Sequence, residues 1–308
     1  PSMLERGYDK KMALGVINTG GGWGILIPPS ILMILYALIT GVSVGKMFAA
    51  GIMPGILLMV LTAIYIVVRC HLQPELAPAL PQEERGTWPE KLRALRAVLL
   101  PIGVVIMVLG SIIGGITTPT EAAAMGVLGA LISAAVYRQF KWSILQEAAI
   151  RTFKLTGMIM WILFAAHAFS AAYQSMGAQD LIEGLMNMIP GGPWGIIVAM
   201  MVIVFLLAMV LDPVGIMLIT LPVFMPIVES LGFDPIWFGI LFVINMEIGY
   251  MTPPFGFNLF YLKGVVPPSI TMKDIYSSII PFVIVEIVGL GLIMIFPQIA
   301  TYLPDLLF

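Results

Sequence analysis

Glycine and proline interrupt two apolar segments of the sequence, and small polar side chains flank both interruptions. The first stretch reads GGGWGILIPPSIL at residues 20–32, and the second reads EIGYMTPPFGFNL at residues 247–259. A helix that breaks inside a membrane leaves backbone N–H and C=O groups without partners, which is costly in hydrocarbon. Such breaks persist where free carbonyls ligate a cation or where the next half-helix attracts an anion. The two stretches therefore predict sites for an ion and a substrate.

The residue types around both breaks suit this chemistry. Proline has no N–H to leave unpaired and fits the first turn of the following half-helix, which applies to Pro28, Pro29, Pro253 and Pro254. Glycine allows unusual dihedral angles and the close approach of an ion, which applies to Gly20, Gly21, Gly22, Gly24, Gly249 and Gly256. Neutral oxygens and amides come from Asn18, Thr19, Ser30, Asn245, Thr252 and Asn258. We predict that the substrate path is lined by Asn18, Ser30, Thr252 and Asn258. The alternative is a pair of structural proline kinks, which are common in membrane helices.

Four ionisable side chains lie in or beside apolar segments, where such groups are candidates for function. Asp212 in the LDP motif either binds a ligand or caps a helix beside Pro213. Glu247 either binds a cation or proton, or is a protonated acid with its hydrogen bonds satisfied. Glu121 in TPTEAAA fits the first turn of a helix better than a ligand role. His167 fits a hydrogen-bonded packing role better than a proton relay.

Composition sets the class of protein that must hold these residues. The chain is 60% hydrophobic and 10% charged, whereas soluble domains carry about 25% charged residues. Its apolar runs are continuous and do not alternate as barrel strands do, so we expect an all-α polytopic membrane protein. Nucleotide-binding and metalloprotease motifs are absent, as is a basic stripe for nucleic acid. With one cysteine, Cys70, and two histidines, we expect neither an enzyme nor a cofactor.

The apolar runs predict the following segments. The first part has a broken helix at 11–40, interrupted at 19–29, a connecting helix at 42–53, a crossing at 54–70 and a polar loop at 71–97. The middle part has crossings at 98–114 and 119–137, an interfacial helix at 141–154, a crossing at 155–175 and a polar connection at 176–193. The last part has two arms at 194–211 and 213–230, a second broken helix at 236–262, a crossing at 275–296 and a short tail. We expect Cys70 to be a small apolar side chain near a helix end.

Lysine and arginine set the predicted orientation, because they gather in cytoplasmic loops. If 11–40 runs from inside to outside and 54–70 returns, every basic cluster falls inside and Lys46 alone falls outside. This topology requires residues 194–230 to enter and leave on the outer face. We therefore predict a re-entrant hairpin with LDP at its tip.

An offset of 225 residues relates the two broken helices. Glycine, proline and aspartate recur in the same order, with Asp9 over Asp234, Gly24 over Gly249, and Pro28-Pro29 over Pro253-Pro254. The predicted topology makes the copies antiparallel, which is the inverted repeat of secondary transporters. We assign residues 1–97 to the C-terminal part of a first repeat and residues 98–308 to a second. On this reading the chain is the last two thirds of a longer protein, and an N-terminal hairpin is missing.

The sequence resembles a known transporter family in several ordered motifs. They are GGGWGILIPPSI, TPTEAAAMGVLGAL, LDPVGIMLITLPVFMPI and EIGYMTPPFGFNLF, and the likeness runs from residue 1 to 296. It resembles the large, DctM-like membrane subunit of tripartite ATP-independent periplasmic (TRAP) transporters. The resemblance implies an elevator-type, sodium-driven importer of carboxylates in the bacterial inner membrane. It also implies two partners, a small four-helix membrane subunit (DctQ-like) and a periplasmic substrate-binding protein (DctP-like).

The resemblance further implies where Na⁺ would bind, namely where hairpin tips meet the loops of broken helices. Here that means the loop at Thr19–Gly24, and the tip Asp212 with the segment from Gly249 to Thr252. The residues concerned are Thr19, Gly20, Gly22, Gly24, Asp212, Gly249, Met251 and Thr252. The alternative is a proton-coupled or exchanging transporter of the same architecture, with protons carried by Asp212, Glu247 and His167.

Overall fold

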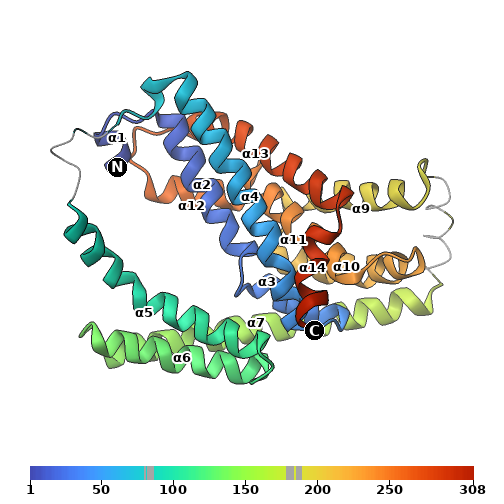
Figure 1. The fold of residues 1–308 in the computed structure, drawn as a ribbon. Helices are drawn as coiled ribbons and strands as arrows, with labels where there is room; N and C mark the ends of the chain where they lie inside the picture. The colour runs from blue at the N-terminus through green and yellow to red at the C-terminus, as the bar shows by residue number, and fades with distance from the viewer. Residues whose placement is uncertain (80, 82–86, 178–183, 185–188) are drawn as a thin grey trace. The chain divides into compact units, whose positions relative to one another are not determined.

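The computed structural model describes residues 1–79, 81, 87–177, 184 and 189–308 (Figure 1). The described residues form helices and no strand. They divide into two compact units, one made of residues 1–78 and 162–308 and the other of residues 79–161. Within the described part of the chain, six helical segments are long and apolar enough to cross a membrane. These features agree with the predicted all-α membrane protein.

The first unit contains both broken helices. Its elements are α1 (Ser2–Glu5), α2 (Lys10–Leu26), α3 (Ile31–Thr40), α4 (Val44–Leu72), the 3-10 turn η1 (Pro74–Leu76), α9 (Gly192–Ala208), α10 (Pro213–Ser230), α11 (Pro235–Met251), α12 (Phe257–Val265), α13 (Met272–Ile295) and α14 (Gln298–Leu307). The second unit contains α5 (Trp88–Ile113), α6 (Pro119–Val136) and the first part of α7 (Trp142–Ser175).

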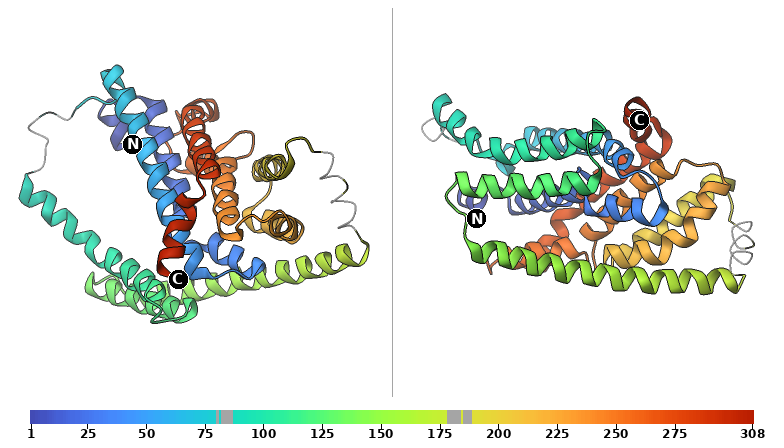
Figure 2. Two further views of the ribbon diagram at one scale, coloured as in Figure 1. Left: turned by 45° about the vertical axis from the view of Figure 1, so that its right-hand side comes forward. Right: turned by 90° about the horizontal axis from the view of Figure 1, so that it is seen from below.

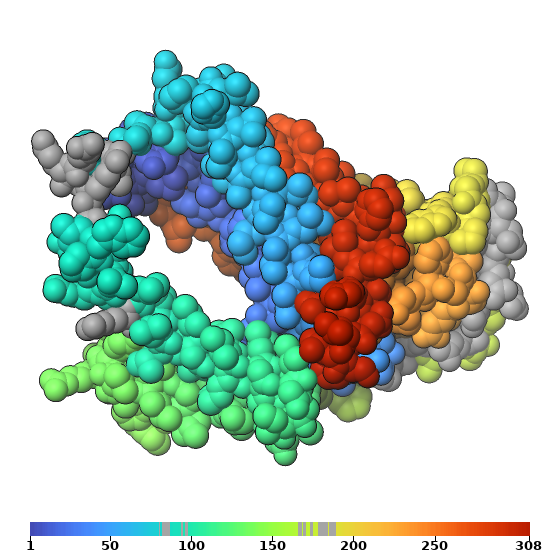
Figure 3. Space-filling view, in the orientation of Figure 1, coloured from blue at the N-terminus to red at the C-terminus, as the bar shows by residue number. Residues whose placement is uncertain are grey.

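Helix α11 forms the centre of the first unit. Every residue from Trp237 to Met251 is buried, as expected for a helix that is apolar all round and surrounded by others. Helices α2, α4, α9 and α13 pack against it (Figure 2). On the face shown in Figure 3, α14 in dark red covers one end of α4 in blue. This packing places the first half of each broken helix in the interior.

The two broken helices share their local structure at the predicted offset. Helices α2 and α11 are both 17 residues long, and each begins after an aspartate, Asp9 or Asp234, whose side chain caps it. The preceding glycines, Gly7 and Gly232, have φ angles of 78° and 77°, a left-handed conformation that glycine adopts easily. The Pro28-Pro29 and Pro253-Pro254 peptide bonds are both cis. The two segments therefore resemble each other in local conformation as well as in sequence.

Several predicted boundaries are wrong. The first interruption covers Ile27–Ser30 rather than 19–29, because α2 continues through its glycines to Leu26. The predicted segments 42–53 and 54–70 form the single helix α4, which accommodates Pro54. Residues 141–154 and 155–175 likewise lie in one helix, α7. The predicted tail contains α14.

The polar loop predicted at 71–97 ends earlier than expected. Helix α5 begins at Trp88, where the Glu90 carboxylate accepts a hydrogen bond of 2.7 Å from the Thr87 backbone N–H. This capping box starts the helix ten residues before the apolar run at Val98. Part of the loop, at 80 and 82–86, and part of the connection predicted at 176–193 lie outside the described residues.

Helices α9 and α10 confirm the two predicted arms and their turn at LDP. The turn runs from Met209 to Asp212, and Asp212 caps α10 by accepting a hydrogen bond of 3.0 Å from the Gly215 N–H. Whether the hairpin is re-entrant stays a prediction, as do the repeat boundaries at 97 and 98.

In the second unit, α5 and α6 pack through small residues. A Cβ built on Gly129 would lie 2.8 Å from a methyl carbon of Val104, and one built on Gly126 would lie 3.1 Å from a methyl carbon of Val108. Close approach at glycine is the usual way in which membrane helices gain van der Waals contact.

Candidate functional site

The first break leaves backbone carbonyls at the end of α2. Pro28 and Pro29 have no N–H to donate to the carbonyls of Gly24 and Ile25, four residues earlier. The Ser30 hydroxyl donates to the Ile25 carbonyl. The same oxygen accepts a hydrogen bond of 3.4 Å from the Met33 N–H, so that Ser30 also caps α3. The carbonyl of Gly24 is therefore the group that the proline pair leaves without a helical donor.

The predicted loop at Thr19–Gly24 is helical, so that part of the prediction is wrong. The helix continues through all four glycines, but only Gly22 is closely packed. Gly20, Gly21 and Gly24 have open space where a side chain would lie, whereas a Cβ on Gly22 would lie 2.7 Å from Oε1 of Glu247. Gly22 therefore allows α2 and α11 to approach closely.

The second break covers Thr252–Gly256 and depends on backbone contacts. The Thr252 hydroxyl donates to the Ile248 carbonyl at 2.7 Å, and the Thr252 N–H donates to the Gly249 carbonyl at 3.1 Å. A Cβ on Gly256 would lie 2.4 Å from the Tyr250 carbonyl oxygen. The loop can fold back at this point only because residue 256 is glycine.

The structure brings the end of α9, just before the hairpin turn, against α11 near its C-terminal end. Gly249 packs against Ala208 at the end of α9, where an added Cβ would lie 2.3 Å from the Ala208 Cβ. The turn that contains Asp212 follows Ala208 directly. Asp212 therefore follows, four residues along the chain, a residue that contacts the last turns of α11. The Asp212 side chain is exposed, and Met251 is buried.

The predicted substrate residues differ in the groups that they leave available. Ser30 and Thr252 donate their hydroxyl protons to backbone carbonyls. The side-chain amide nitrogens of Asn18 and Asn258 are buried and have no hydrogen-bond partner. The Met251 sulfur would lie 3.3 Å from a Cβ on Gly22. The end of α11 thus meets the stretch of α2 one turn after Asn18.

Two buried glutamates lie against neighbouring residues of α2, and sequence reasoning found only one of them. Glu247 on α11 and Glu286 on α13 are both fully buried. The indole nitrogen of Trp23 donates a hydrogen bond of 3.0 Å to Oε1 of Glu286, whereas neither oxygen of Glu247 has a partner. The signal for Glu286 was present, because an acid in the apolar run 275–296 follows the rule applied to Glu247.

The remaining candidate residues are part of helix caps or helix packing, or lie outside the described residues. Glu121 caps α6 together with Thr118, as predicted, through a backbone hydrogen bond of 2.7 Å. Asn245 donates a hydrogen bond of 2.5 Å to the Met201 carbonyl and thereby ties α11 to α9. Cys70 is partly buried near the end of α4. The side chain of His167 lies outside the described residues.

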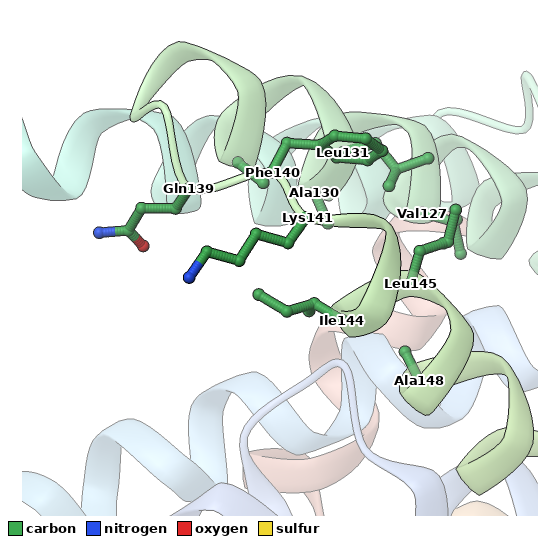
Figure 4. Close-up of a pocket in the computed structure, with 10 residues that line it drawn as sticks. Val127, Ala130, Leu131, Gln139, Phe140, Lys141, Ile144, Leu145 and Ala148 are labelled. Carbon is green, nitrogen blue, oxygen red and sulfur yellow. The ribbon is translucent and has the colours of Figure 1, made fainter.

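A separate apolar pocket lies in the second unit, where α6 turns into α7 (Figure 4). It holds about 300 Å³ and is lined by Val127, Leu131, Ile144 and Leu145, with Lys141 at its edge. It contains none of the residues predicted to bind an ion or substrate.

Comparison of the sequence with known proteins identifies the same family by a family model and by individual relatives. Residues 1–299 match the family described as "Tripartite ATP-independent periplasmic transporter, DctM component". The chain is 35% identical over 309 residues to the ectoine TRAP transporter large permease protein TeaC of Halomonas elongata, covering 100% of this chain and 71% of the relative. It is 34% identical over 308 residues to the C4-dicarboxylate TRAP transporter large permease protein DctM of Pseudomonas aeruginosa, covering 98% and 70%. It is 30% identical over 319 residues to the 2,3-diketo-L-gulonate TRAP transporter large permease protein YiaN of Escherichia coli, covering 100% and 69%.

Proposed function

The chain belongs to the DctM family of TRAP transporter large permeases, and from this premise we propose that it imports organic acids by coupling their entry to sodium. The family is one of transporter permeases, and the chain is a multi-pass protein of the bacterial inner membrane. The observation that carries the proposal is the pair of broken helices, whose breaks combine free backbone carbonyls with neutral polar side chains.

The substrate class follows from the relatives and from the breaks. One relative is named for C4-dicarboxylates and another for 2,3-diketo-L-gulonate. The first turns of α3 and α12 face the breaks with their backbone N–H groups, of which Ser30 caps the Met33 N–H, and the N-terminus of a helix favours a carboxylate. We propose that the free amides of Asn18 and Asn258 add hydrogen bonds to the substrate. The substrate would be delivered by a periplasmic binding protein, and a small four-helix subunit would accompany the permease.

The sodium sites would lie at the two breaks. At the first, the Gly24 carbonyl is the ligand that the structure supports best, because Pro28 cannot donate to it. At the second, Asp212 and the backbone from Gly249 to Thr252 lie at the same end of α11. We propose that closure of the hairpin over this end binds the ion, and that an elevator-type movement then carries ion and substrate across.

Proton coupling is the alternative that a specific observation favours. Glu247 and Glu286 are buried without a basic partner among the described salt bridges. Groups of this kind act as proton carriers in other membrane proteins. Asp212 and His167 would complete such a pathway.

Reconstituted uptake separates these two proposals. The permease would be placed in proteoliposomes with the other components of its transporter, and uptake of a labelled dicarboxylate would be measured under imposed gradients. We expect accumulation with an inward Na⁺ gradient at equal pH on both sides. Accumulation with an inward proton gradient in the absence of Na⁺ would contradict sodium coupling. A failure under both gradients with every tested acid would contradict the substrate class.

A further inference from the structure

Two neighbouring cavities of the first unit share a wall near the end of α4. One holds about 360 Å³ and is lined by the polar side chains Asp9, Lys11, Arg69 and Ser277 together with apolar ones such as Met12 and Phe282. The other holds about 310 Å³ and lies between apolar side chains of α4 and α13. Arg69 and Tyr65 line both cavities. A charged pocket therefore adjoins an apolar groove, and neither belongs to the site at the helix breaks.

The charged pocket has an excess of positive charge. Lys11 and Arg69 line it, and neither takes part in the salt bridges found among the described residues. The negative group in the pocket is Asp9, whose carboxylate is engaged as the cap of α2 and accepts a hydrogen bond of 2.8 Å from the Met12 N–H. The neighbouring Lys10 is paired with Asp274 at 2.8 Å. Two unpaired cations thus remain for an anion.

The groove has the character of a surface that faces hydrocarbon. Ile64 and Val68 on α4 and Ile284 and Val288 on α13 are each about half exposed, at 54%, 51%, 57% and 51%. These two helices lie side by side, as the light-blue and red surfaces in Figure 3 show. Both are among the segments long and apolar enough to cross a membrane. An acyl chain in this groove would cover apolar surface that the described residues leave exposed.

Arg69 and Tyr65 lie where the charged pocket meets the apolar groove, so the two cavities adjoin as the headgroup and the acyl chain of a phospholipid do. Arginine buries its aliphatic stem along apolar surface while its guanidinium group stays in a polar environment. The Tyr65 ring is fixed by an edge-to-face contact with Phe282, with centroids 5.2 Å apart. The basic helix ends around the pocket are those predicted to be cytoplasmic, where anionic lipids give the membrane surface its negative potential.

We propose that this pair of cavities binds an anionic phospholipid, with its phosphate between Lys11 and Arg69 and one acyl chain along α4 and α13. The position would tie the start of α2 to the end of α4 and to the first two thirds of α13 through one bound molecule. The inference depends on the membrane location and the cavities, and not on sodium coupling.

Native mass spectrometry of the detergent-solubilised permease tests the headgroup contacts. We expect phosphatidylglycerol to bind more tightly than phosphatidylcholine. Lys11→Gln and Arg69→Gln should each weaken phosphatidylglycerol binding about fivefold, because one basic residue near the membrane surface contributes about 1 kcal/mol. Lys46→Gln, a cation at the other end of α4, is the matched control and should leave binding unchanged. Equal binding of both lipids, or equal binding by the two variants and the control, would overturn the proposal.

A second variant tests the acyl chain. Val288→Trp fills the groove without altering the charged pocket, and it should reduce phosphatidylglycerol binding while leaving binding of glycerol phosphate unchanged. Glycerol phosphate, which has no acyl chains, should bind far more weakly than the lipid to the unaltered protein. If it binds as tightly, the pocket takes a free phosphate compound and the lipid assignment is wrong. Unchanged thermal midpoints of the variants would show that their fold is retained.

Discussion

At the scale of single residues, the buried stripe of α2 decides how closely three helices approach. Gly15 faces the Phe282 ring of α13, and Gly22 faces Glu247 of α11. Between them Asn18 and Thr19 bring unpartnered polar atoms into the interior. Gly22 lies on this buried face and contacts Glu247 closely, so it is a packing residue as well as a neighbour of the proposed site.

We predict that Gly22→Ala destabilises the protein, whereas Gly21→Ala does not. The added methyl group at residue 22 meets the fully buried Glu247, and such overpacking costs about 1–3 kcal/mol. Residue 21 has open space and lies within a helix, so alanine there should leave stability unchanged or raise it by up to about 1 kcal/mol. Thermal unfolding in detergent would measure both. Equal midpoints for the two variants would refute the close contact of α2 with α11.

Asp212 caps α10 and is proposed to bind Na⁺, and one substitution can separate these two roles. Asparagine caps helices about as well as aspartate, so Asp212→Asn should preserve α10 and remove the negative charge. We expect a rise of at least roughly tenfold in the Na⁺ concentration for half-maximal uptake, since a charged ligand contact contributes about 1.5–3 kcal/mol. Asp234→Asn changes the matching cap of α11 and is the control. If both variants show the same Na⁺ dependence as the unaltered protein, Asp212 is only a cap.

At the scale of elements, local sequence signals predicted helix starts better than helix breaks. Thr118 with Glu121 marked the start of α6, and Asp212 marked the start of α10. The break near Pro28 was predicted too early because glycine is unfavourable in an isolated helix. In the structure Gly22 gains close packing against α11, and this tertiary contact keeps the helix intact to Leu26. Such a contact cannot be read from neighbouring residues.

The contact between the hairpin and α11 yields a prediction about this element. Gly249→Ala should separate α9 from α11, because the new methyl group would meet the Cβ and backbone of Ala208, which cannot rotate away. We expect a loss of about 1–3 kcal/mol in stability together with reduced uptake. Gly264→Ala in α12 has open space and serves as the control. Should the Gly249 variant behave like the control, the hairpin turn does not rest on the end of α11.

At the scale of the whole molecule, the sequence predicted the all-α membrane class and most of the helical segments. Composition was sufficient for the class, and the 225-residue offset recurs in the bounds and caps of α2 and α11. The candidate site was predicted only in part. The contact between Trp23 and Glu286 was missed because it joins residues 263 positions apart, and no local pattern encodes such a pairing. Glu286 itself could have been found as an acid within an apolar run.

The predicted topology can be tested by labelling single cysteines. In a Cys70→Ser background, Gln73→Cys and Ser230→Cys place thiols at exposed positions after α4 and at the end of α10. The positive-inside pattern places the first in the cytoplasm and the second outside. A membrane-impermeant maleimide should therefore label Ser230→Cys in intact cells and label Gln73→Cys only after lysis. Labelling of both from the same side would contradict the topology.

The most direct test of sodium-coupled import is substrate-dependent entry of radioactive sodium. Proteoliposomes would contain the permease with its small subunit, and the binding protein would be added outside, with or without its organic acid. The account predicts that sodium entry rises when loaded binding protein is added, and that Asp212→Asn reduces this rise while Asp234→Asn does not. Accumulation of the acid with no accompanying entry of sodium would contradict the account.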